Sequence, residues 1–130
     1  TPMQFIITDN TAVFRFEQLV ISAAEIEKAQ LQLQRLLAEN DIEHRGLPVV
    51  LDFNAAAYMK KAELQAVIAG VRMCRDYGRG VAIAARNPML FHYFELVQLL
   101  QFVPIFTDYS SAITAAQQQR PASTPNQLPY

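Results

Sequence analysis

Two nearly uninterrupted runs of apolar residues are the clearest strand signals in the chain. They occupy residues 48–53, with the sequence PVVLDF, and residues 80–85, with the sequence GVAIAA. Neither run alternates between apolar and polar positions, as a strand with one solvated face would, so both faces of each strand are expected to be covered. We predict that the two segments are neighbouring parallel strands of a central sheet.

The first part of the chain has the pattern of a β-hairpin. Residues 5–8 are apolar and β-branched, Asp9-Asn10 supplies turn chemistry, and residues 13–16 resume the apolar pattern. Two short apolar segments separated by turn residues are typical of antiparallel strands joined by a tight turn.

Two amphipathic helices are predicted from apolar residues at helical spacing. The first begins at Ser22 and Glu25, whose S-x-x-E spacing is that of a capping box, and the second ends near Tyr77-Gly78. The apolar positions of the first helix are Ile26, Ala29, Leu33, Leu36 and Leu37, and those of the second are Leu64, Val67, Ile68, Val71 and Cys74.

The segment that follows the second buried strand is unusually apolar. Asn87-Pro88 is a strong helix start, and the predicted helix covers residues 89–100, with apolar residues on more than one side. One interpretation is a helix held between the sheet and a neighbouring helix. The other is that part of residues 88–103 forms a protein-contact patch.

The predicted order of elements defines an α/β fold. After the hairpin, strands alternate with helices, and a short strand at residues 103–106 precedes a last helix at residues 110–116. This order predicts a mostly parallel sheet with about four helices packed on it. We expect a single domain over residues 1–116 and a Gln/Pro-rich tail without packed structure over residues 117–130.

Composition excludes several classes of function. The chain has 130 residues, of which 52% are apolar, and its net charge is −1, so no global field attracts nucleic acid or an anionic membrane. The single cysteine, Cys74, excludes an internal disulfide and a cysteine-rich zinc site, and its place in the apolar pattern predicts a buried hydrophobe. No membrane-spanning run or signal peptide is recognised. We therefore expect a cytoplasmic protein without direct membrane insertion.

Catalytic signatures are weak. His44 and His92 lie far apart and have no companion at metal-ligand spacing. Asp52 ends a buried strand, where α/β enzymes often keep a carboxylate, but we favour a turn-forming role in which it accepts backbone N–H bonds. The sequence GRG at residues 78–80 precedes a strand and lacks the spacing of a phosphate loop. We expect no enzymatic activity, no cofactor and no metal.

The turn between the first buried strand and the second helix contains an unexpected pair of cations. In the stretch NAAAYMKKAELQAV, Lys60 and Lys61 stand where the helix dipole favours acids, and no Ser, Thr, Asp or Asn directly precedes them as a cap. One interpretation is a solvated pair tolerated in a surface loop. The other is a contact surface for a partner.

The chain resembles STAS domains, the fold of bacterial anti-sigma factor antagonists and of the cytoplasmic end of some anion transporters. The resemblance is carried by LPVVLDFNAAAYMKKAEL followed by a helix, by GVAIAARNP, and by ELVQLLQFVPIFTDYSSAI. It implies a non-catalytic protein-interaction module of a bacterial regulatory system, with an anti-sigma factor, a serine-kinase-like protein or another regulator as partner. The alternatives are an accessory or C-terminal domain of an anion or lipid transporter, and a small-ligand pocket or an enzyme that uses Asp52 and the lysines.

The resemblance also implies a missing regulatory residue. Family members have Asp-Ser-Ser-Gly where this chain has Lys60, Lys61, Ala62 and Glu63, and the second serine is the one that the partner kinase phosphorylates. Since Ala62 has no hydroxyl, the phosphorylation that releases the partner in the family is not expected here.

We expect partner binding at the loop after the first buried strand and at the turn after the second. Neighbouring parallel strands end at the same sheet edge, so both segments should form one locally basic area with Tyr58 and Met59 as apolar anchors. A homodimer is left open. The expected partner-binding residues are Asn54, Tyr58, Met59, Lys60, Lys61, Ala62, Glu63, Arg86 and Asn87.

Overall fold

The computed structural model describes residues 3–38 and 46–119 of the chain. The predictions made for His44 and for residues 120–130 of the Gln/Pro-rich segment lie outside the described residues.

The described residues form a five-stranded sheet with strand order β1-β2-β3-β4-β5. The antiparallel hairpin of β1 and β2 opens it, and β2, β3, β4 and β5 run parallel to one another. Val49 pairs with Val81, and Asp52 pairs with Ala84, which confirms that the two apolar runs are neighbouring parallel strands. The strands are β1 (Met3–Thr8), β2 (Thr11–Phe16), β3 (Val49–Asp52), β4 (Val81–Ala84) and β5 (Ile105–Phe106).

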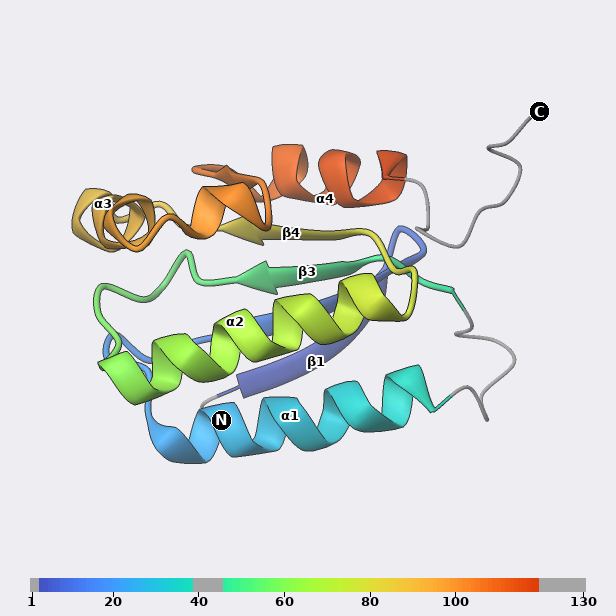
Figure 1. Ribbon diagram of the computed structural model, residues 1–130, viewed down its shortest axis with the longest axis horizontal. Coiled ribbons are helices and arrows are strands. Elements are labelled where there is room, and N and C mark those ends of the chain that lie inside the picture. Colours follow the sequence, from blue (N-terminus) through green and yellow to red (C-terminus); the bar gives the residue numbers. More distant parts are fainter. Residues whose placement is uncertain (1–2, 39–45, 120–130) are drawn as a thin grey trace.

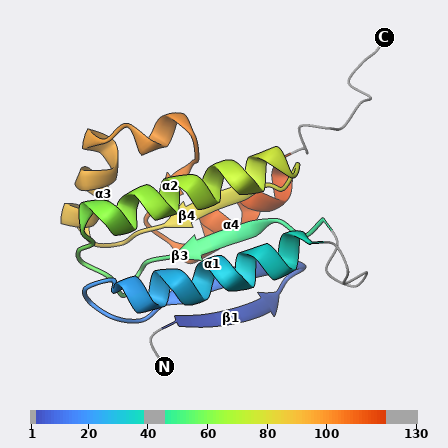
Figure 2. The ribbon, with the colours of Figure 1, turned by 60° about the horizontal axis from the view of Figure 1, so that its bottom comes forward.

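Helices cover both faces of the sheet (Figure 1). Helices α1 (Ala23–Leu37) and α2 (Lys61–Asp76) lie side by side on one face, as Figure 2 shows, and α4 (Tyr109–Gln118) covers the other. Helix α3 (Pro88–Leu96) and the 3₁₀ turn η2 (Leu99–Gln101) add residues to the same core as α1 and α2. The order of elements is the one that the sequence predicts, and the α/β class is confirmed.

The cores on the two sides of the sheet are built from side chains of different size. On the side of α1 and α2, Phe16 stacks on Phe53 with 4.7 Å between ring centroids, and Phe94 of α3 lies 5.9 Å from Phe53. On the side of α4 the core is built largely from small side chains of the central strands, such as Ala82 and Ala84. The chain can therefore approach closely there. A Cβ atom at Gly80 would collide with the carbonyl oxygen of Ala116, so only glycine fits at that position.

Three helix boundaries differ from the predicted ones. Helix α3 ends at Leu96 instead of continuing to residue 100, because Gln98 adopts a left-handed conformation with φ of 62°. The last helix begins at Tyr109 because the Asp108 carboxylate caps it, accepting the N–H of Ser111 at 2.8 Å. It continues to Gln118, which lies inside the segment predicted to be an unpacked tail.

Candidate partner-binding site

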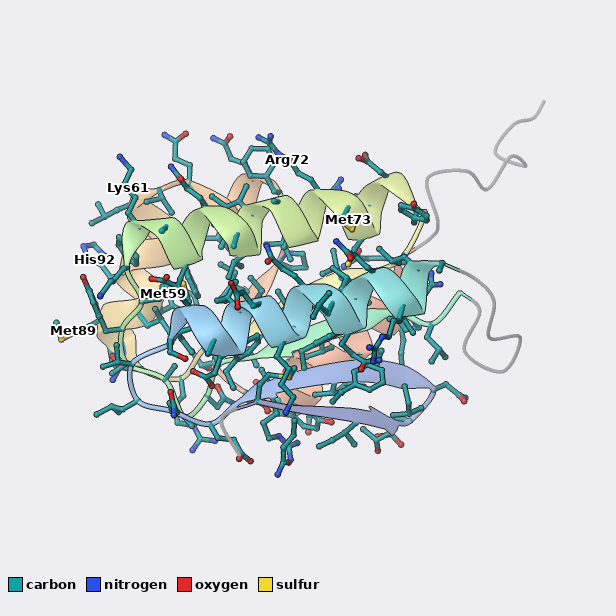
Figure 3. All side chains as sticks on the ribbon, turned by 90° about the horizontal axis from the view of Figure 1, so that it is seen from below. Met59, Lys61, Arg72, Met73, Met89 and His92 are labelled. Carbon is teal, nitrogen blue, oxygen red and sulfur yellow. The ribbon has the colours of Figure 1, made fainter. Side chains whose placement is uncertain are left out.

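The two segments predicted to bind a partner lie at the same edge of the sheet. The loop from Asn54 to Lys60 follows β3, and Arg86-Asn87 follows β4, whose last residue pairs with the last residue of β3. Figure 3 shows Met59, Lys61, Met89 and His92 gathered at this end of the molecule. The predicted proximity of these segments follows from the parallel pairing of their strands.

The start of α2 has no side-chain cap. Lys60 is the N-cap residue and its side chain makes no capping hydrogen bond, while Lys60, Lys61 and Ala62 are all exposed. The first N–H groups of a helix and its dipole give this end a partial positive charge, to which the lysines add. Glu63, the acid of the first turn, is buried. The solvent-facing part of this turn is therefore basic.

A second loop, which the sequence analysis missed, is attached to the first by backbone hydrogen bonds. The N–H of Ala57 donates to the carbonyl of Leu19 at 2.7 Å, and the N–H of Ile21 donates to the carbonyl of Tyr58 at 3.0 Å. Val20 and Tyr58 form a parallel β-bridge. Leu19, Val20 and Tyr58 are all exposed large hydrophobic residues, so the two loops present one joined apolar area. One sequence feature could have indicated this loop. Leu19 and Val20 form an apolar pair between the predicted hairpin and the capping box, and the pair belongs neither to the strand pattern nor to the helix pattern.

Met59 does not offer the apolar surface that we predicted. Its side chain is fully buried in the core, whereas that of Tyr58 is exposed. The reason is the bridge between Tyr58 and Val20: in an extended segment successive side chains point to opposite sides, so an outward Tyr58 places Met59 inward.

Asp52 has the turn-forming role that we favoured. Its Oδ1 accepts the N–H of Asn54 at 3.0 Å, and its Oδ2 accepts Nε of Arg15 at 3.2 Å. The Arg15 guanidinium in turn lies 5.5 Å from the ring centroid of Tyr109. Both carboxylate oxygens of Asp52 are thus engaged in holding the start of the loop and the neighbouring strand.

Asn87 acts as the cap of α3. Its Oδ1 accepts the N–H of Met89 at 2.8 Å and the N–H of Leu90 at 3.4 Å. Arg86, one residue earlier, is exposed. Arg86 is therefore the exposed charged residue of this turn, whereas the Asn87 amide oxygen accepts hydrogen bonds within the chain.

No group of three or more His, Cys, Asp or Glu residues that could hold a metal ion occurs within 3–38 and 46–119. His92 lies on the surface of α3, with Nδ1 3.5 Å from Oε1 of Glu95. Burial raises the pKa of Cys74 to about 12, so its thiol remains protonated at neutral pH, as expected for a buried hydrophobe. In the part of the chain that the structure describes, no helix is long and apolar enough to span a membrane.

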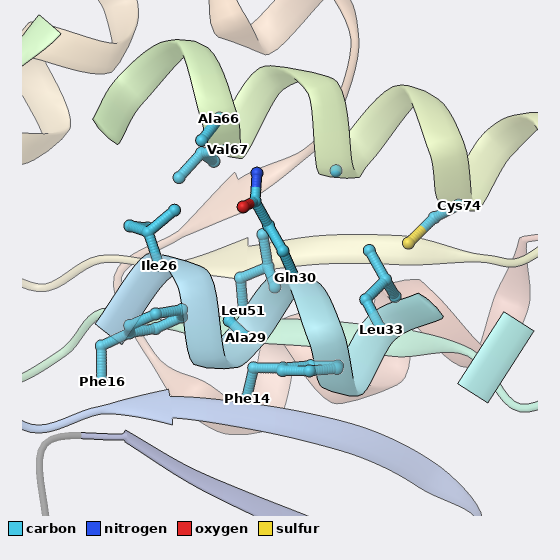
Figure 4. A pocket seen from close by; sticks show the side chains of 11 residues that line it. Phe14, Phe16, Ile26, Ala29, Gln30, Leu33, Leu51, Ala66, Val67 and Cys74 are labelled. Atoms are coloured by element: carbon cyan, nitrogen blue, oxygen red, sulfur yellow. The ribbon is translucent and has the colours of Figure 1, made fainter. Parts of the chain in front are cut away.

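A small apolar cavity lies between α1 and α2 (Figure 4). Its volume is about 40 Å³, and Gln30 is the polar residue in a lining otherwise made of hydrophobic or small side chains. An apolar cavity that binds benzene has a volume of about 150 Å³. The cavity is therefore too small for a ligand of that size. The lining residues are Phe14, Phe16, Ile26, Ala29, Gln30, Leu33, Leu51, Ala66, Val67, Gly70 and Cys74.

Comparisons with known proteins identify the family. The sequence matches the STAS domain over residues 3–112, and the chain belongs to this family. A search of curated protein sequences found no match.

Solved structures with the same fold include three anti-sigma factor antagonists, each covering 89% of this chain. The first, from Mycobacterium paratuberculosis, is 17% identical with a TM-score of 0.72 over 93% of its own chain. A putative antagonist from Thermotoga maritima is 16% identical with a TM-score of 0.66 over 95% of its chain. SpoIIAA in its unphosphorylated form is 17% identical with a TM-score of 0.62 over 98% of its chain. At these identities the likeness establishes the fold.

Proposed function

We propose that this STAS domain is a non-catalytic protein-interaction module of a bacterial regulatory system that acts in the cytoplasm. It would bind its partner through a surface that we call the loop surface. This surface consists of the exposed residues Leu19, Val20, Tyr58, Lys60, Lys61 and Arg86.

One observation carries the proposal: the chain exposes large apolar side chains on loops that are held in place. The contacts of Ala57 with Leu19 and of Ile21 with Tyr58 are backbone hydrogen bonds, and Asp52 holds the start of the loop. Ordered loops lose less conformational entropy on binding than mobile ones. Exposed apolar groups beside cations suit a partner that has an acidic rim around an apolar contact.

Ala62 is the departure from the family's motif that bears on regulation. Ala62 is exposed in the first turn of α2, and the resemblance to the family aligns it with the serine that is phosphorylated there. A phosphate on that turn would add about two negative charges to a basic surface. Because neither Ala62 nor its neighbours Lys61 and Glu63 carries a hydroxyl, we expect the partner to be bound without this phosphorylation switch.

The first step of the test is to isolate the partner in a way that depends on the loop surface. The wild-type chain and a Tyr58→Ala/Lys60→Glu/Lys61→Glu variant serve as parallel baits in extracts of the native cell. A protein retained by both baits binds elsewhere on the chain. The expected partner is retained by the wild type and lost from the variant, and it is then purified for kinetic measurements.

The second step measures association and dissociation by surface plasmon resonance. Lys60→Glu/Lys61→Glu should slow association, and the effect should shrink at high salt because screening weakens long-range attraction. Tyr58→Ala should act mainly on dissociation, by about 1–3 kcal/mol if Tyr58 is a central anchor. Arg35→Glu, at the opposite end of α1, is the charge control. Wild-type kinetics in both loop variants would exclude the loop surface as the binding site.

A further inference from the structure

The segment from α3 to η2 is apolar on two sides, and one side is already used. Leu90, Phe94 and Leu99 point into the core and are fully buried. Since a helix on the surface of a domain needs one apolar face to pack, this set accounts for the attachment of the segment to the domain. The remaining apolar residues of the segment require a separate explanation.

Three large apolar side chains of the segment are exposed. Met89 is 78% exposed, Leu96 is 67% exposed and Leu100 is 43% exposed. Met89 and Leu96 are two helical turns apart and therefore lie on the same side of α3, and Leu100 follows in η2. Figure 2 shows this segment at one corner of the molecule, and in Figure 3 Met89 points away from the domain.

Arginine residues lie at both ends of the segment. Residues 88–103 contain no lysine or arginine and a single acid, Glu95, which is next to His92. Arg86 precedes the segment in the chain. At its other end two arginines of α2 contact Phe102: the Arg72 guanidinium lies 5.2 Å from the centroid of its ring, and Arg75 donates a hydrogen bond to its carbonyl.

Three aromatic residues of the segment are partly buried. Phe91, Tyr93 and Phe102 pack against the core while retaining contact with solvent. Aromatic rings of this kind are enriched where an apolar phase meets water, because each has an apolar body and Tyr also has a polar tip. The segment thus has an apolar outer side, an aromatic margin and arginines at both ends.

We propose that the segment from α3 to η2 is a contact site for an anionic phospholipid surface. Met89, Leu96 and Leu100 would enter the boundary between headgroups and acyl chains, while Arg72, Arg75 and Arg86 reach the lipid phosphates. An apolar helical face with cations beside it binds a membrane by burying apolar area and by attraction to anionic lipids, without spanning the bilayer. The basic ends of the segment favour a negatively charged surface over a neutral one. The lipid site shares Arg86 with the loop surface, and its apolar residues do not belong to that surface.

The test uses the absence of tryptophan from the chain. A single Leu96→Trp substitution provides a fluorescent reporter on the outer side of α3. Leu31→Trp is the matched control, because Leu31 is 57% exposed on α1. Vesicles of phosphatidylglycerol and phosphatidylcholine in equal amounts are compared with vesicles of phosphatidylcholine alone. We expect the emission of the Leu96→Trp chain to shift to shorter wavelength with the anionic vesicles, and that of the Leu31→Trp chain to stay unchanged.

Co-sedimentation of the full chain with the same vesicles gives an independent readout. Leu96→Ser should weaken binding to the anionic vesicles by about tenfold, the loss expected when one buried leucine is removed from an apolar phase. Leu31→Ser should leave it unchanged. Thermal unfolding verifies that both variants are folded.

Three results would overturn the proposal. The first is no binding of the wild-type chain to anionic vesicles, and the second is an equal effect of Leu31→Ser and Leu96→Ser. The third is a wild-type dimer in light scattering that Leu96→Ser converts to a monomer while vesicle binding is unaffected, because the exposed side would then be an interface between copies of the chain.

Discussion

At the scale of single residues, the Glu25 side chain caps a helix and is also a buried carboxyl group, and these two properties have opposite effects on its pKa. It is 1% exposed, and its Oε1 accepts the N–H of Ser22 at 3.1 Å while the Ser22 hydroxyl accepts the N–H of Glu25 at 3.2 Å. This capping box satisfies the start of α1. The other carboxylate oxygen, Oε2, is buried without a hydrogen-bond partner. Burial raises the pKa of Glu25, although the hydrogen bond from Ser22 opposes this effect.

The raised pKa predicts how Glu25 changes the stability of the domain with pH. Between the pKa of the unfolded chain and that of the folded chain, the folded state binds more protons at this site, so the free energy of unfolding falls as pH rises. Glu25→Gln keeps an acceptor for Ser22 but does not ionise. The wild type should therefore lose stability relative to Glu25→Gln as pH rises through this range, in urea unfolding measured at a series of pH values.

The control for this experiment is Glu27→Gln, which removes an exposed acid two residues further along α1. Its stability should follow that of the wild type with pH. If the Glu25→Gln and wild-type curves run parallel, the burial of the carboxylate does not affect its titration.

At the scale of elements, the packing of α1 against α2 leaves a small empty space. Gly70 in the interior of α2 lines the cavity, and a Cβ atom added there would lie 3.6 Å from Cδ2 of Leu33, an ordinary van der Waals distance. The backbone of α2 therefore does not require glycine at this position. Nothing in the contact between the two helices explains why glycine occurs there.

Gly70→Ala should stabilise the domain by about 1 kcal/mol, because alanine is favoured over glycine in a helix interior by about that amount and its methyl group fills part of the cavity. Urea unfolding measures the change in the free energy of unfolding. Ala69→Gly, at the exposed neighbouring position, is the reverse control and should destabilise by a similar amount. A loss of stability in Gly70→Ala would show that the two helices need the closer approach that glycine permits.

The elements that the sequence predicts well are those with strong periodic signals. The uninterrupted runs at β3 and β4, the capping box of α1 and the Asn87-Pro88 start of α3 all agree with the structure. The predicted end of α3 was wrong because apolar residues continue past Leu96. A hydrophobicity pattern gives no indication that the backbone of Gln98 is left-handed. Local periodicity reports what a helix buries and is less informative about where its backbone stops.

The candidate site was predictable only where it depends on strand order. Parallel pairing of β3 and β4 places the segments after them together, and this follows from the sequence. The bridge between Val20 and Tyr58 joins residues that are far apart in the chain, and no local pattern indicates it. The same bridge turns Met59 inward. It therefore explains both why the loop with Val20 was not predicted and why Met59 is not the exposed apolar anchor that we expected.

At the scale of the whole molecule, the last described residues tie distant parts of the domain together. Nε2 of Gln117 donates to the carbonyl of Asp9 in the hairpin turn at 2.5 Å. The side-chain amide of Gln119 pairs with the backbone of Val81 in both directions, accepting its N–H at 3.0 Å and donating to its carbonyl at 2.7 Å. This amide occupies the part of the β4 edge that the short β5 leaves unpaired.

These contacts predict that the domain extends beyond residue 116. A chain that ends at Ala116 should be less stable than one that ends at Gln119 by about 1–3 kcal/mol, since each net hydrogen bond contributes about 0.5–1.5 kcal/mol. Thermal unfolding of the two truncated chains measures this difference. Gln119→Ala in the longer chain separates the side-chain pairing with Val81 from the loss of the helix end. Equal midpoints for the two truncated chains would place the boundary at residue 116, as the composition suggested.

The place where Gln119 meets Val81 also has a practical consequence for how this protein is attached to a surface. Val81 begins β4, whereas the loop surface and α3 follow the far ends of β3 and β4. A linker joined after the final residue of the domain therefore departs from the end of the sheet opposite to both proposed contact sites. Chains anchored through such a linker on a sensor chip or bead present the loop surface and the outer side of α3 to the solution. Anchoring through a residue of α3 would instead obstruct both sites.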